Sequence, residues 1–563
     1  MKRTLLSALV SAALLAGSGA AYAQEAATRA ARAADWTTWG YGHERPNWNR
    51  GETTLTKANI AKLKLLWSSQ LSTKPTDIVL STLTAPLVVQ NAATPGGPKD
   101  LVILLGADDT LFAVDANSGR VVWQKTFVNT LKPLREANWL CPNSPNATPT
   151  IDKQKGIVYF ITSDGKLRAA SLSDGAEKMA PTDMVAPFAR AWSLNLIDDV
   201  VYTTSARGCG NIVDKNSATA AAATDTPRPG SPPPDPSNIA AMDVRDPAHP
   251  VLTRFFTSGG RASGPWGRGG VARTHRGVIT QTADGQVDPA SGNFGSSVLL
   301  LAPHVARLVD SFTASNWRYQ NTHDLDLGSG SVMTFPFAKR DLAASIGKEG
   351  VLYLLDTANL GGSDHATPLY QSPQLGNDAA IGTEPGQGMW GALATYESPA
   401  GKRYLYIPMW GPPSTKAPPF KFTNGAIPHG SIMAFQLSEE GGKITLIPQW
   451  TSPDMIVPDS PTVANGIVFA MQTGEQTLQR ELAKAGQPAP PVGPGAGAQF
   501  RATPVSNLVL YAFDAETGKQ LYSSKKIIKG WTHFSEPVVA LGKVFIVTHD
   551  GQLHAFGLRS TRK

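Results

Sequence analysis

The sequence predicts an all-β protein that forms a single eight-bladed β-propeller of four-stranded antiparallel blades with loop insertions. Three observations lead to this prediction. A pattern of strands and turns recurs along the chain, turn-forming residues are frequent with 53 Gly and 43 Pro, and only 17% of the 563 residues are charged. Because Gly and Pro interrupt helices and build turns, short strands are expected rather than long helices.

Each repeat has an alternating strand, an Asp-Gly or similar turn, a second strand that ends in a small residue, an apolar residue and Asp, and a Gly turn. The clearest copies are residues 101–123 (LVILLGADDTLFAVDANSGRVVW) and residues 508–522 (LVLYAFDAETGKQLY). Alternation buries every second side chain, and Gly119 and Gly518 allow the chain to reverse. One position marks each of the eight copies: Asp115, Ser173, Asp243, Ala302, Asp356, Gln436, Asp514 and Gly557.

The spacing of the copies predicts insertions within one ring. A blade of this type takes roughly 40–50 residues, so the longer gaps hold extra loops near residues 214–238, 411–429 and 477–505. No change of composition separates the copies, which favours one propeller over residues 35–560 rather than a sandwich or several small β domains. The strand at residues 63–71 precedes the first full copy and is placed to complete the last blade.

Residues 1–23 have the order of a secretory signal peptide. Lys2 and Arg3 precede an apolar run at residues 5–15, and Ala-Tyr-Ala at residues 21–23 forms a cleavage site. We expect cleavage after residue 23 and export, most simply to the periplasm. The alternative, an uncleaved anchor, is disfavoured because the run is shorter than the roughly 20 residues that a spanning helix needs, and no later stretch reaches that length.

The charge pattern excludes one class of partner. Loss of the leader lowers the net charge from +7 to +5, and the basic residues are scattered, so nucleic acid is not an expected ligand. Export would allow Cys141 and Cys209 to form a disulfide, with two buried free thiols as the alternative.

The repeats, together with DWTTWG at residues 35–40 and NIAKLKLLW at residues 59–67, resemble the quinoprotein alcohol dehydrogenase-like propellers. That family binds pyrroloquinoline quinone (PQQ) and also contains non-enzymatic outer-membrane assembly scaffolds. The resemblance covers nearly the whole mature chain. The blade pattern by itself fits enzymes and scaffolds equally, so the function depends on the site.

Residues 266–295 (WGRGGVARTHRGVITQTADGQVDPASGNFG) are similar to the family segment in which a Trp forms the floor beneath the quinone and an Asn ligates Ca²⁺. The resemblance implies that Trp266 is the floor. Asp284 falls on the Asn position, which retains an oxygen ligand for a hard cation. A Glu that usually ligates Ca²⁺ from the third blade has no clear counterpart, and Asn211 is the substitute.

Residues 315–333 (SNWRYQNTHDLDLGSGSVM) resemble the stretch that holds the catalytic Asp, and the Asp-x-Asp-x-Gly form is most similar to the polyvinyl alcohol dehydrogenase branch. The resemblance makes Asp324 the catalytic and metal-binding candidate, with Asp326 as the alternative. Lys348 occupies the place of the Lys or Arg beneath the quinone carbonyls. Trp390 matches a Trp that faces the cofactor.

These residues also have structural interpretations. Trp266 and Trp390 could pack between blades, Asp284 and the two later aspartates could cap turns, and Lys348 could form an exposed pair with Glu349. The sequence leaves both interpretations open.

The resemblance implies oxidation of an alcohol or sugar-like hydroxyl by hydride transfer to PQQ, assisted by Ca²⁺. Such a reaction needs a base, an electrophile and a polarising cation. The substrate would be a small-molecule or polymeric alcohol. Electrons would leave to a separate soluble acceptor such as a cytochrome c, because the chain has no Cys-x-x-Cys-His haem motif.

One further departure from the family pattern keeps two other functions open. The chain lacks the two adjacent cysteines that cover the quinone in characterised members of the family. The first alternative is a non-catalytic scaffold that binds envelope proteins or peptides. The second is a propeller hydrolase or lyase, for which the sequence supplies no nucleophile and base pair.

Overall fold

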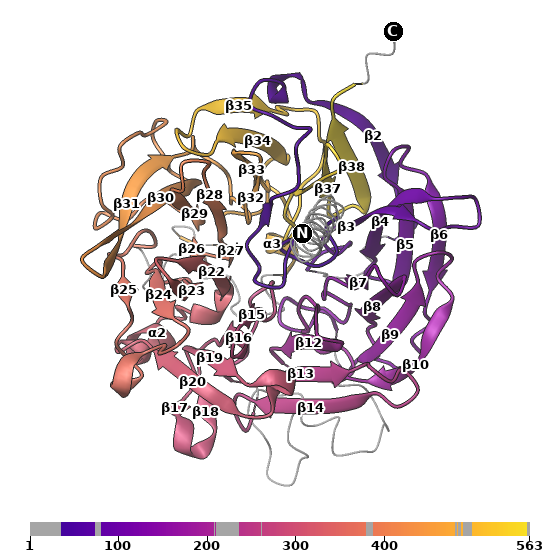
Figure 1. Ribbon diagram of the computed structural model, residues 1–563, viewed down its shortest axis with the longest axis horizontal. Helices are drawn as coiled ribbons and strands as arrows, with labels where there is room; N and C mark the ends of the chain where they lie inside the picture. The colour runs from indigo at the N-terminus through magenta and orange to yellow at the C-terminus, as the bar shows by residue number, and fades with distance from the viewer. Residues whose placement is uncertain are drawn as a thin grey trace, which may run out of the picture.

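The computed structural model describes residues 35–73, 80–134, 136–207, 209, 236–260, 262–378, 387–478, 481, 486–487 and 498–559. The predicted leader at residues 1–23 and the predicted ligand Asn211 lie outside these residues. Eight main antiparallel sheets form a ring around a central axis (Figure 1). The predicted all-β, eight-bladed propeller is confirmed.

Each blade contributes four main strands, in order from the inside of the ring outwards. Blade 1 consists of β3 (Leu87–Ala92), β4 (Lys99–Leu105), β5 (Thr110–Asp115) and β6 (Val121–Thr126), and blade 2 of β7 (Thr150–Asp152), β8 (Ile157–Ile161), β9 (Lys166–Ser171) and β10 (Glu177–Asp183). Blade 3 consists of β11 (Asn195–Ile197), β12 (Val200–Ser205), β13 (Asn238–Asp243) and β14 (Val251–Phe256), and blade 4 of β15 (Ala272–Thr274), β16 (Gly277–Gln281), β19 (Ser297–Leu301) and β20 (Leu308–Thr313).

Blade 5 consists of β22 (Met333–Phe337), β23 (Arg340–Ser345), β24 (Tyr353–Asp356) and β25 (Tyr370–Gln371), and blade 6 of β28 (Ala394–Glu397), β29 (Arg403–Trp410), β30 (Gly430–Glu440) and β31 (Lys443–Thr451). Blade 7 consists of β32 (Thr462–Ala464), β33 (Ile467–Gln472), β34 (Val509–Asp514) and β35 (Gln520–Ser523), and blade 8 of β36 (Val538–Ala540), β37 (Lys543–Val547), β38 (Gln552–Gly557) and β2 (Lys64–Gln70). Seven of the eight repeat positions fall at the end of the third strand of a blade or within two residues after it, and Gln436 falls inside the third strand of blade 6. The repeat therefore identified the correct strand in every blade.

Short elements complete the fold. The additional strands are β1 (Trp48–Asn49), β17 (Val287–Asp288), β18 (Asn293–Phe294), β21 (Gly330–Ser331), β26 (Gly388–Met389) and β27 (Gly391–Ala392). The helices are α2 (Trp317–Thr322), α3 (Ala498–Arg501) and the 3₁₀ turns η1 (Ile60–Lys62), η3 (Pro289–Ser291), η4 (Pro303–Val305), η5 (Leu327–Ser329) and η6 (Gly362–Asp364). In the part of the chain that the structure describes, no helix has the length and apolar character needed to cross a membrane.

The ring is closed by strands from both ends of the chain. β2 pairs antiparallel with β38, in a register that runs from Lys64 opposite Gly557 to Gln70 opposite Gln552. The predicted role of the strand at residues 63–71 is therefore confirmed. Closure of this kind removes exposed sheet edges, which stabilises the ring against pairing with other chains.

Glycines in the turns also serve contacts between blades. Gly119 has a φ of +73°, and a Cβ added there would lie 2.6 Å from the Trp67 ring of the preceding blade. Gly518 has a φ of +71° and makes the same approach to Trp450. The sequence indicated that glycine is needed at these positions for the turn. The structure adds a second reason for glycine, because a tryptophan of one blade packs flat against the turn of the next blade and leaves no room for a side chain.

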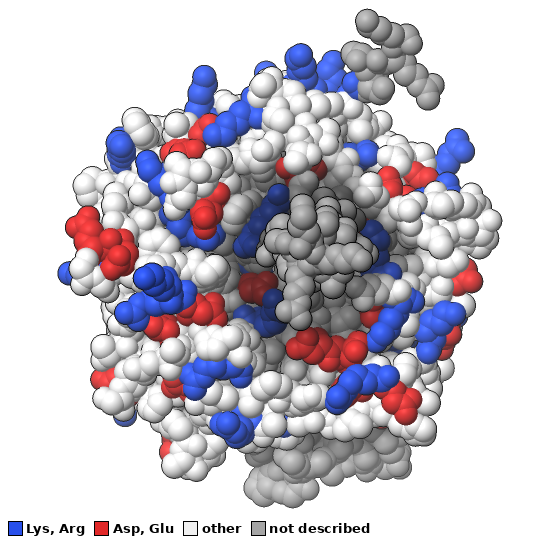
Figure 2. Space-filling model, viewed as in Figure 1, with Lys and Arg blue, Asp and Glu red and all other residues white. Residues whose placement is uncertain are grey.

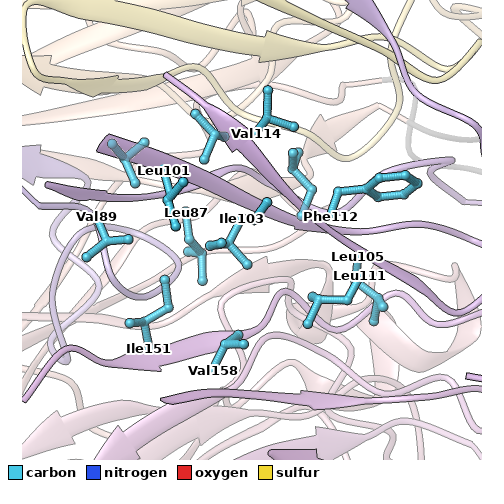
Figure 3. Packing of buried hydrophobic residues seen from close by; sticks show 14 of the residues in the cluster. Leu87, Val89, Leu101, Ile103, Leu105, Leu111, Phe112, Val114, Ile151 and Val158 are labelled. Carbon is cyan, nitrogen blue, oxygen red and sulfur yellow. The ribbon is translucent and has the colours of Figure 1, made fainter. Parts of the chain in front are cut away.

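The core lies between adjacent blades. In blade 1, Leu101 and Ile103 are fully buried on the face that packs toward Ile151 and Val158 of blade 2 (Figure 3), whereas Val114, which pairs with Val102, is fully buried on the opposite face. Because side chains of a strand alternate between its two faces, each blade buries one face against each neighbour. This packing fixes the blades rigidly around the axis.

Antiparallel order assigns each connection to one face of the ring. Connections between the second and third strands of a blade emerge on the same face as connections from the fourth strand to the next blade. Two predicted insertions lie on such connections, residues 411–429 between β29 and β30, and residues 477–505 between β33 and β34. The third, near residues 214–238, belongs to the connection between β12 and β13 and lies almost wholly outside the described residues.

Candidate active site

Five of the predicted site residues lie on this same face of the ring. Trp266 follows β14, and Asp284 follows β16. Asp324 follows α2 in the connection from β20 to β22, Lys348 follows β23, and Trp390 lies between β26 and β27. The structure brings these five residues together near the axis, although they come from separate blades. Figure 2 shows a hollow at the centre of the ring whose wall carries both acidic and basic side chains.

Three aspartates form an acidic triad. One carboxylate oxygen from each of Asp284, Asp324 and Asp326 lies within 4.8 Å of the other two. Asp324 is exposed, Asp284 is half-buried and Asp326 is buried. The backbone N–H of Asp284 donates to Oδ1 of Asp326 at 3.0 Å, whereas Oδ1 of Asp284 is inaccessible and has no hydrogen-bond partner.

Lys348 joins the triad to two aromatic rings. Its Nζ lies 2.7 Å from Oδ2 of Asp326 and 3.0 Å from Oδ1 of Asp324. The same atom lies 5.0 Å from the centre of the Trp390 ring and 5.7 Å from that of Trp266. Lys348 is only 5% exposed, so the interpretation of Lys348 as an exposed pair with Glu349 does not hold.

The surroundings of the triad shift the pKa values of two of its members in opposite directions. Burial, followed by the neighbouring charges of Asp326 and Asp324, raises the pKa of Asp284 to about 9. Burial would also raise the pKa of Asp326, but the Lys348 ammonium holds it below its usual value. Two carboxylates at such short range cannot both ionise without cost, so one retains a proton unless a cation is bound. Separated values of this kind are typical of functional sites.

Helix α2 positions the triad through hydrogen bonds to both neighbouring segments. Asn316 and Gln320 donate to the two carboxylate oxygens of Glu349 at 2.6 and 2.7 Å. The next residue, Asn321, donates through its side chain to the carbonyl of Gly285, next to Asp284. The helix therefore fixes Lys348 and Asp284 relative to the two aspartates that follow it in the chain.

Several residues of the site were missed in the sequence. Arg190, Trp192, Trp139 and Arg501 lie around the axis with Trp266 and Trp390. A signal for some of them is present, because an aromatic residue precedes the first strand of several blades. The four cases are Trp192 before β11, Trp266 before β15, Trp390 before β28 and Phe534 before β36.

The two cysteines lie on the same face. Cys141 and Cys209 form a disulfide that joins the connection between blades 1 and 2 to blade 3, across a sequence separation of 68 residues. Of the two outcomes left open by the sequence, the structure has the bonded one. Cys141 is two residues from Trp139, so the disulfide anchors the loop that carries this ring.

The donor set fits a hard cation. The triad offers only oxygen atoms, which Ca²⁺ and other hard cations prefer, and the unpartnered Oδ1 of Asp284 is an acceptor without a donor. The Trp266 and Trp390 rings pack edge to face, 5.3 Å apart at 68°, so a flat quinone could stack on the face of one of them, with its oxygens toward the Lys348 ammonium. The residues present are therefore compatible with calcium and PQQ.

Comparison with known proteins supports the fold assignment. Residues 44–208 match a family model described as outer membrane protein assembly factor BamB. No curated protein sequence matches the chain.

Three solved structures resemble the whole chain. A quinohemoprotein alcohol dehydrogenase from Pseudomonas putida HK5 is 12% identical with a TM-score of 0.56, covering 95% of this chain and 82% of its own. The quinohemoprotein alcohol dehydrogenase of Comamonas testosteroni is 13% identical with a TM-score of 0.54, covering 94% and 82%. A europium-containing methanol dehydrogenase is 12% identical with a TM-score of 0.58, covering 93% and 98%. The chain thus has the fold of the PQQ-type alcohol dehydrogenase-like β-propellers.

Proposed function

We propose that this protein is a periplasmic quinoprotein oxidoreductase that oxidises an alcohol or sugar-like hydroxyl. One observation carries the proposal: Asp284, Asp324, Asp326 and Lys348, from two blades, converge on one point beside the Trp266 and Trp390 rings. Purely structural turn caps and packing residues have no reason to meet there.

The triad would hold a Ca²⁺ ion or another hard cation. Three carboxylates also provide charge for a trivalent ion, and one of the similar folds is a europium-containing dehydrogenase. A bound cation favours the ionised form of Asp284 and so removes the conflict among the three carboxylates.

Asp324 is the residue that we assign as general base. It is the exposed member of the triad, so it can accept the proton of a substrate hydroxyl. Lys348 contacts both Asp324 and Asp326, but Asp326 is buried and also accepts the Asp284 amide N–H. PQQ, when bound, supplies the hydride acceptor. Lys348 provides a fixed positive charge beside the rings, which stabilises negative charge on nearby oxygens.

Several finer points belong to the same proposal. The signal-peptide pattern at residues 1–23 supports export to the periplasm. The Asp-x-Asp-x-Gly segment, residues 324–328, favours a polyvinyl alcohol-like or other polymeric alcohol as substrate, with small alcohols as the alternative. Electrons would pass to a separate soluble carrier such as a cytochrome c.

Reconstitution tests the function. The mature chain is incubated with PQQ and either Ca²⁺ or Eu³⁺, and dye-linked oxidation is measured with a panel of alcohols, sugars and polyvinyl alcohol. We expect metal-dependent oxidation that is lost in Asp324→Asn. Retention is expected in Asp246→Asn, whose carboxylate is 63% exposed on an outer turn. Absence of PQQ binding by calorimetry with either metal would refute the proposal.

A second candidate is a scaffold that binds envelope proteins or peptides. The family-model match over residues 44–208 favours it. This candidate predicts binding of an outer-membrane protein segment by the chain without PQQ, unaffected by Asp324→Asn. Oxidation that depends on Asp324, with no such binding, would exclude it.

A further inference from the structure

Lys348 lies in a turn rather than in a strand, so its position depends on contacts made by its backbone. The turn joins β23 to β24 and has the sequence Gly-Lys-Glu-Gly at residues 347–350. The N–H of Lys348 donates to the carbonyl of Asp326 at 3.1 Å. The carbonyl of Lys348 accepts a hydrogen bond from Nδ2 of Asn377 at 2.6 Å. Its backbone is therefore held on one side by the segment of the acidic triad and on the other side by Asn377.

Asn377 is well suited to this hydrogen bond. It follows β25 and is 3% exposed, and its φ of +65° lies in the left-handed region that Asn adopts more readily than most residues. Gly388 packs against the same carbonyl of Lys348, because a Cβ added at Gly388 would lie 2.0 Å from that oxygen. Water has no room to replace Asn377 here, so loss of its amide would leave the carbonyl without a donor.

The insertion at residues 411–429 is bonded to the segment that carries this asparagine. The hydroxyl of Ser414 donates to the carboxylate of Asp378. The N–H and the hydroxyl of Thr415 donate to the same carboxylate at 2.7 and 2.8 Å. Hydrogen bonds to an ionised acceptor are stronger than neutral ones. The residue directly after Asn377 is therefore joined to the insertion by three such bonds.

Two further contacts join the insertion to the same segment. The N–H of Ser414 donates to the carbonyl of Leu375 at 3.0 Å. Nζ of Lys416 lies 3.2 Å from Oε1 of Gln374, and Nε2 of Gln374 donates to the carbonyl of Asn377 at 3.0 Å. A continuous series of hydrogen bonds thus runs from the insertion of blade 6 to the backbone of the site lysine.

We propose that Asn377 is a positioning residue for Lys348 and that the insertion at residues 411–429 holds Asn377 in place. The Lys348 ammonium contacts Asp324 and Asp326 from the end of a flexible four-carbon chain. A shift of its backbone is therefore carried directly to the charge beside the triad. The inference rests on the proposed function only for the chemical role of the ammonium group.

Acetylation followed by mass spectrometry tests the position of Lys348 in the mature chain without metal or PQQ. Lysines react with the reagent when they are accessible, so Lys348, which is 5% exposed, should react slowly in the parent protein. Asn377→Gly permits the left-handed backbone but removes the hydrogen bond. It should raise the Lys348 rate by about five- to tenfold, the factor by which loss of one buried hydrogen bond shifts a local opening equilibrium. Asp378→Ala should raise the rate by a smaller factor.

Asn465→Gly is the matched control. Asn465 also has a positive φ, +47°, and its Nδ2 donates to the carbonyl of Leu55 at 3.0 Å. The control removes the same kind of hydrogen bond at the same kind of backbone position, and the Lys348 rate should equal that of the parent. Lys543, a half-buried lysine of blade 8, is the internal reference in each protein. Urea denaturation shows whether a variant has lost stability in general.

Kinetics of the reconstituted protein supply a readout that a purely structural role would not change. Asn377→Gly should lower kcat about tenfold or more, because a misplaced charge acts on the reacting groups. KM for the alcohol should stay within about twofold of the parent. In a Lys348→Met background, Asn377→Gly should have no further effect on kcat, because Asn377 acts only through Lys348.

The outcomes separate this proposal from the proposed function. Equal acetylation of Lys348 in the parent, Asn377→Gly and Asp378→Ala overturns the proposal, and so does a rise that Lys543 shares. Selective acetylation of Lys348 in the variants, without PQQ-dependent oxidation by the parent, would support the positioning and refute the quinoprotein function. Oxidation at the parent rate by variants with a reactive Lys348 would support the positioning and refute the chemical role assigned to Lys348.

Discussion

The acidic triad and the Arg268–Asp459 pair are two charged regions near the same axis, and they are built in opposite ways. Arg268 of blade 4 reaches Asp459 of blade 7, both side chains are at most 5% exposed, and the backbone N–H of Ser535 also donates to Asp459. In the triad, one lysine contacts two of the three carboxylates, and an oxygen of Asp284 has no partner. Satisfied charges hold blades together across the axis, whereas unsatisfied charges of one sign indicate a place for a ligand.

The largest effect should come from breaking the satisfied region. Arg268→Met leaves Asp459 buried without its partner and should lower the free energy of unfolding by about 3–5 kcal/mol, measured by urea denaturation. Replacing both residues, as Arg268→Met with Asp459→Leu, should restore most of the loss because no unpaired charge remains. A single variant as stable as the parent would contradict a structural role for the pair.

The same kind of change in the triad should have the opposite effect on stability. Asp284→Asn removes one of three crowded carboxylates, so stability near pH 7 should stay equal or rise. The affinity for Ca²⁺ should fall by about 10–100-fold, because one charged ligand is lost. Calorimetric titration with Ca²⁺ measures the metal affinity, and urea denaturation measures the stability. Asp246→Asn is the control for both. Loss of stability with unchanged metal affinity would show that Asp284 only caps a turn.

The pH dependence distinguishes the two regions further. Because the pKa of Asp284 is raised to about 9, the folded metal-free protein holds a proton there that the unfolded chain, with a pKa near 3.9, has released at neutral pH. Stability should therefore decline as pH rises between about 5 and 9, by up to about 1.4 kcal/mol per pH unit relative to Asp284→Asn. Unfolding free energies of the two proteins at several pH values test this. A constant difference between them would exclude a raised pKa.

The smallest effect concerns the support of the triad. Glu349→Gln retains the size of the side chain but weakens two charge-assisted hydrogen bonds to α2, at a cost of roughly 1 kcal/mol. Because Glu349 does not contact the triad, we expect metal affinity to fall only a few-fold, with an unchanged number of sites. Calorimetric titration with Ca²⁺ measures this affinity, which should fall further in Glu349→Ala than in Glu349→Gln. Equal metal affinity in all three proteins would show that α2 is positioned by other contacts.

The strand pattern predicted much of the fold because each signal is local. Alternation, the turn glycines Gly119 and Gly518 and the repeat positions depend on residues close in the chain, and they gave the eight blades and the closing strand. The family resemblance also named Trp266, Asp284, Asp324, Lys348 and Trp390, which the structure places together. What each of them does there is a proposal.

Other features depend on residues brought together only by closure of the ring. Arg190 and Arg501 are 311 positions apart, and nothing near either residue in the sequence shows that they lie beside the same tryptophan cluster. Asp326 is a second example of this dependence on the folded ring. It is buried and accepts a hydrogen bond from the backbone N–H of Asp284, which lies in a different connection between strands.

The sequence by itself therefore determined the class of fold, the number of blades and the segments that carry the site, because strand periodicity and turn chemistry act over a few residues. Only the tertiary structure decided which charges are paired, which are crowded and which are left unpaired. Those properties depend on distances and burial across blades, and the ring sets them when its ends close.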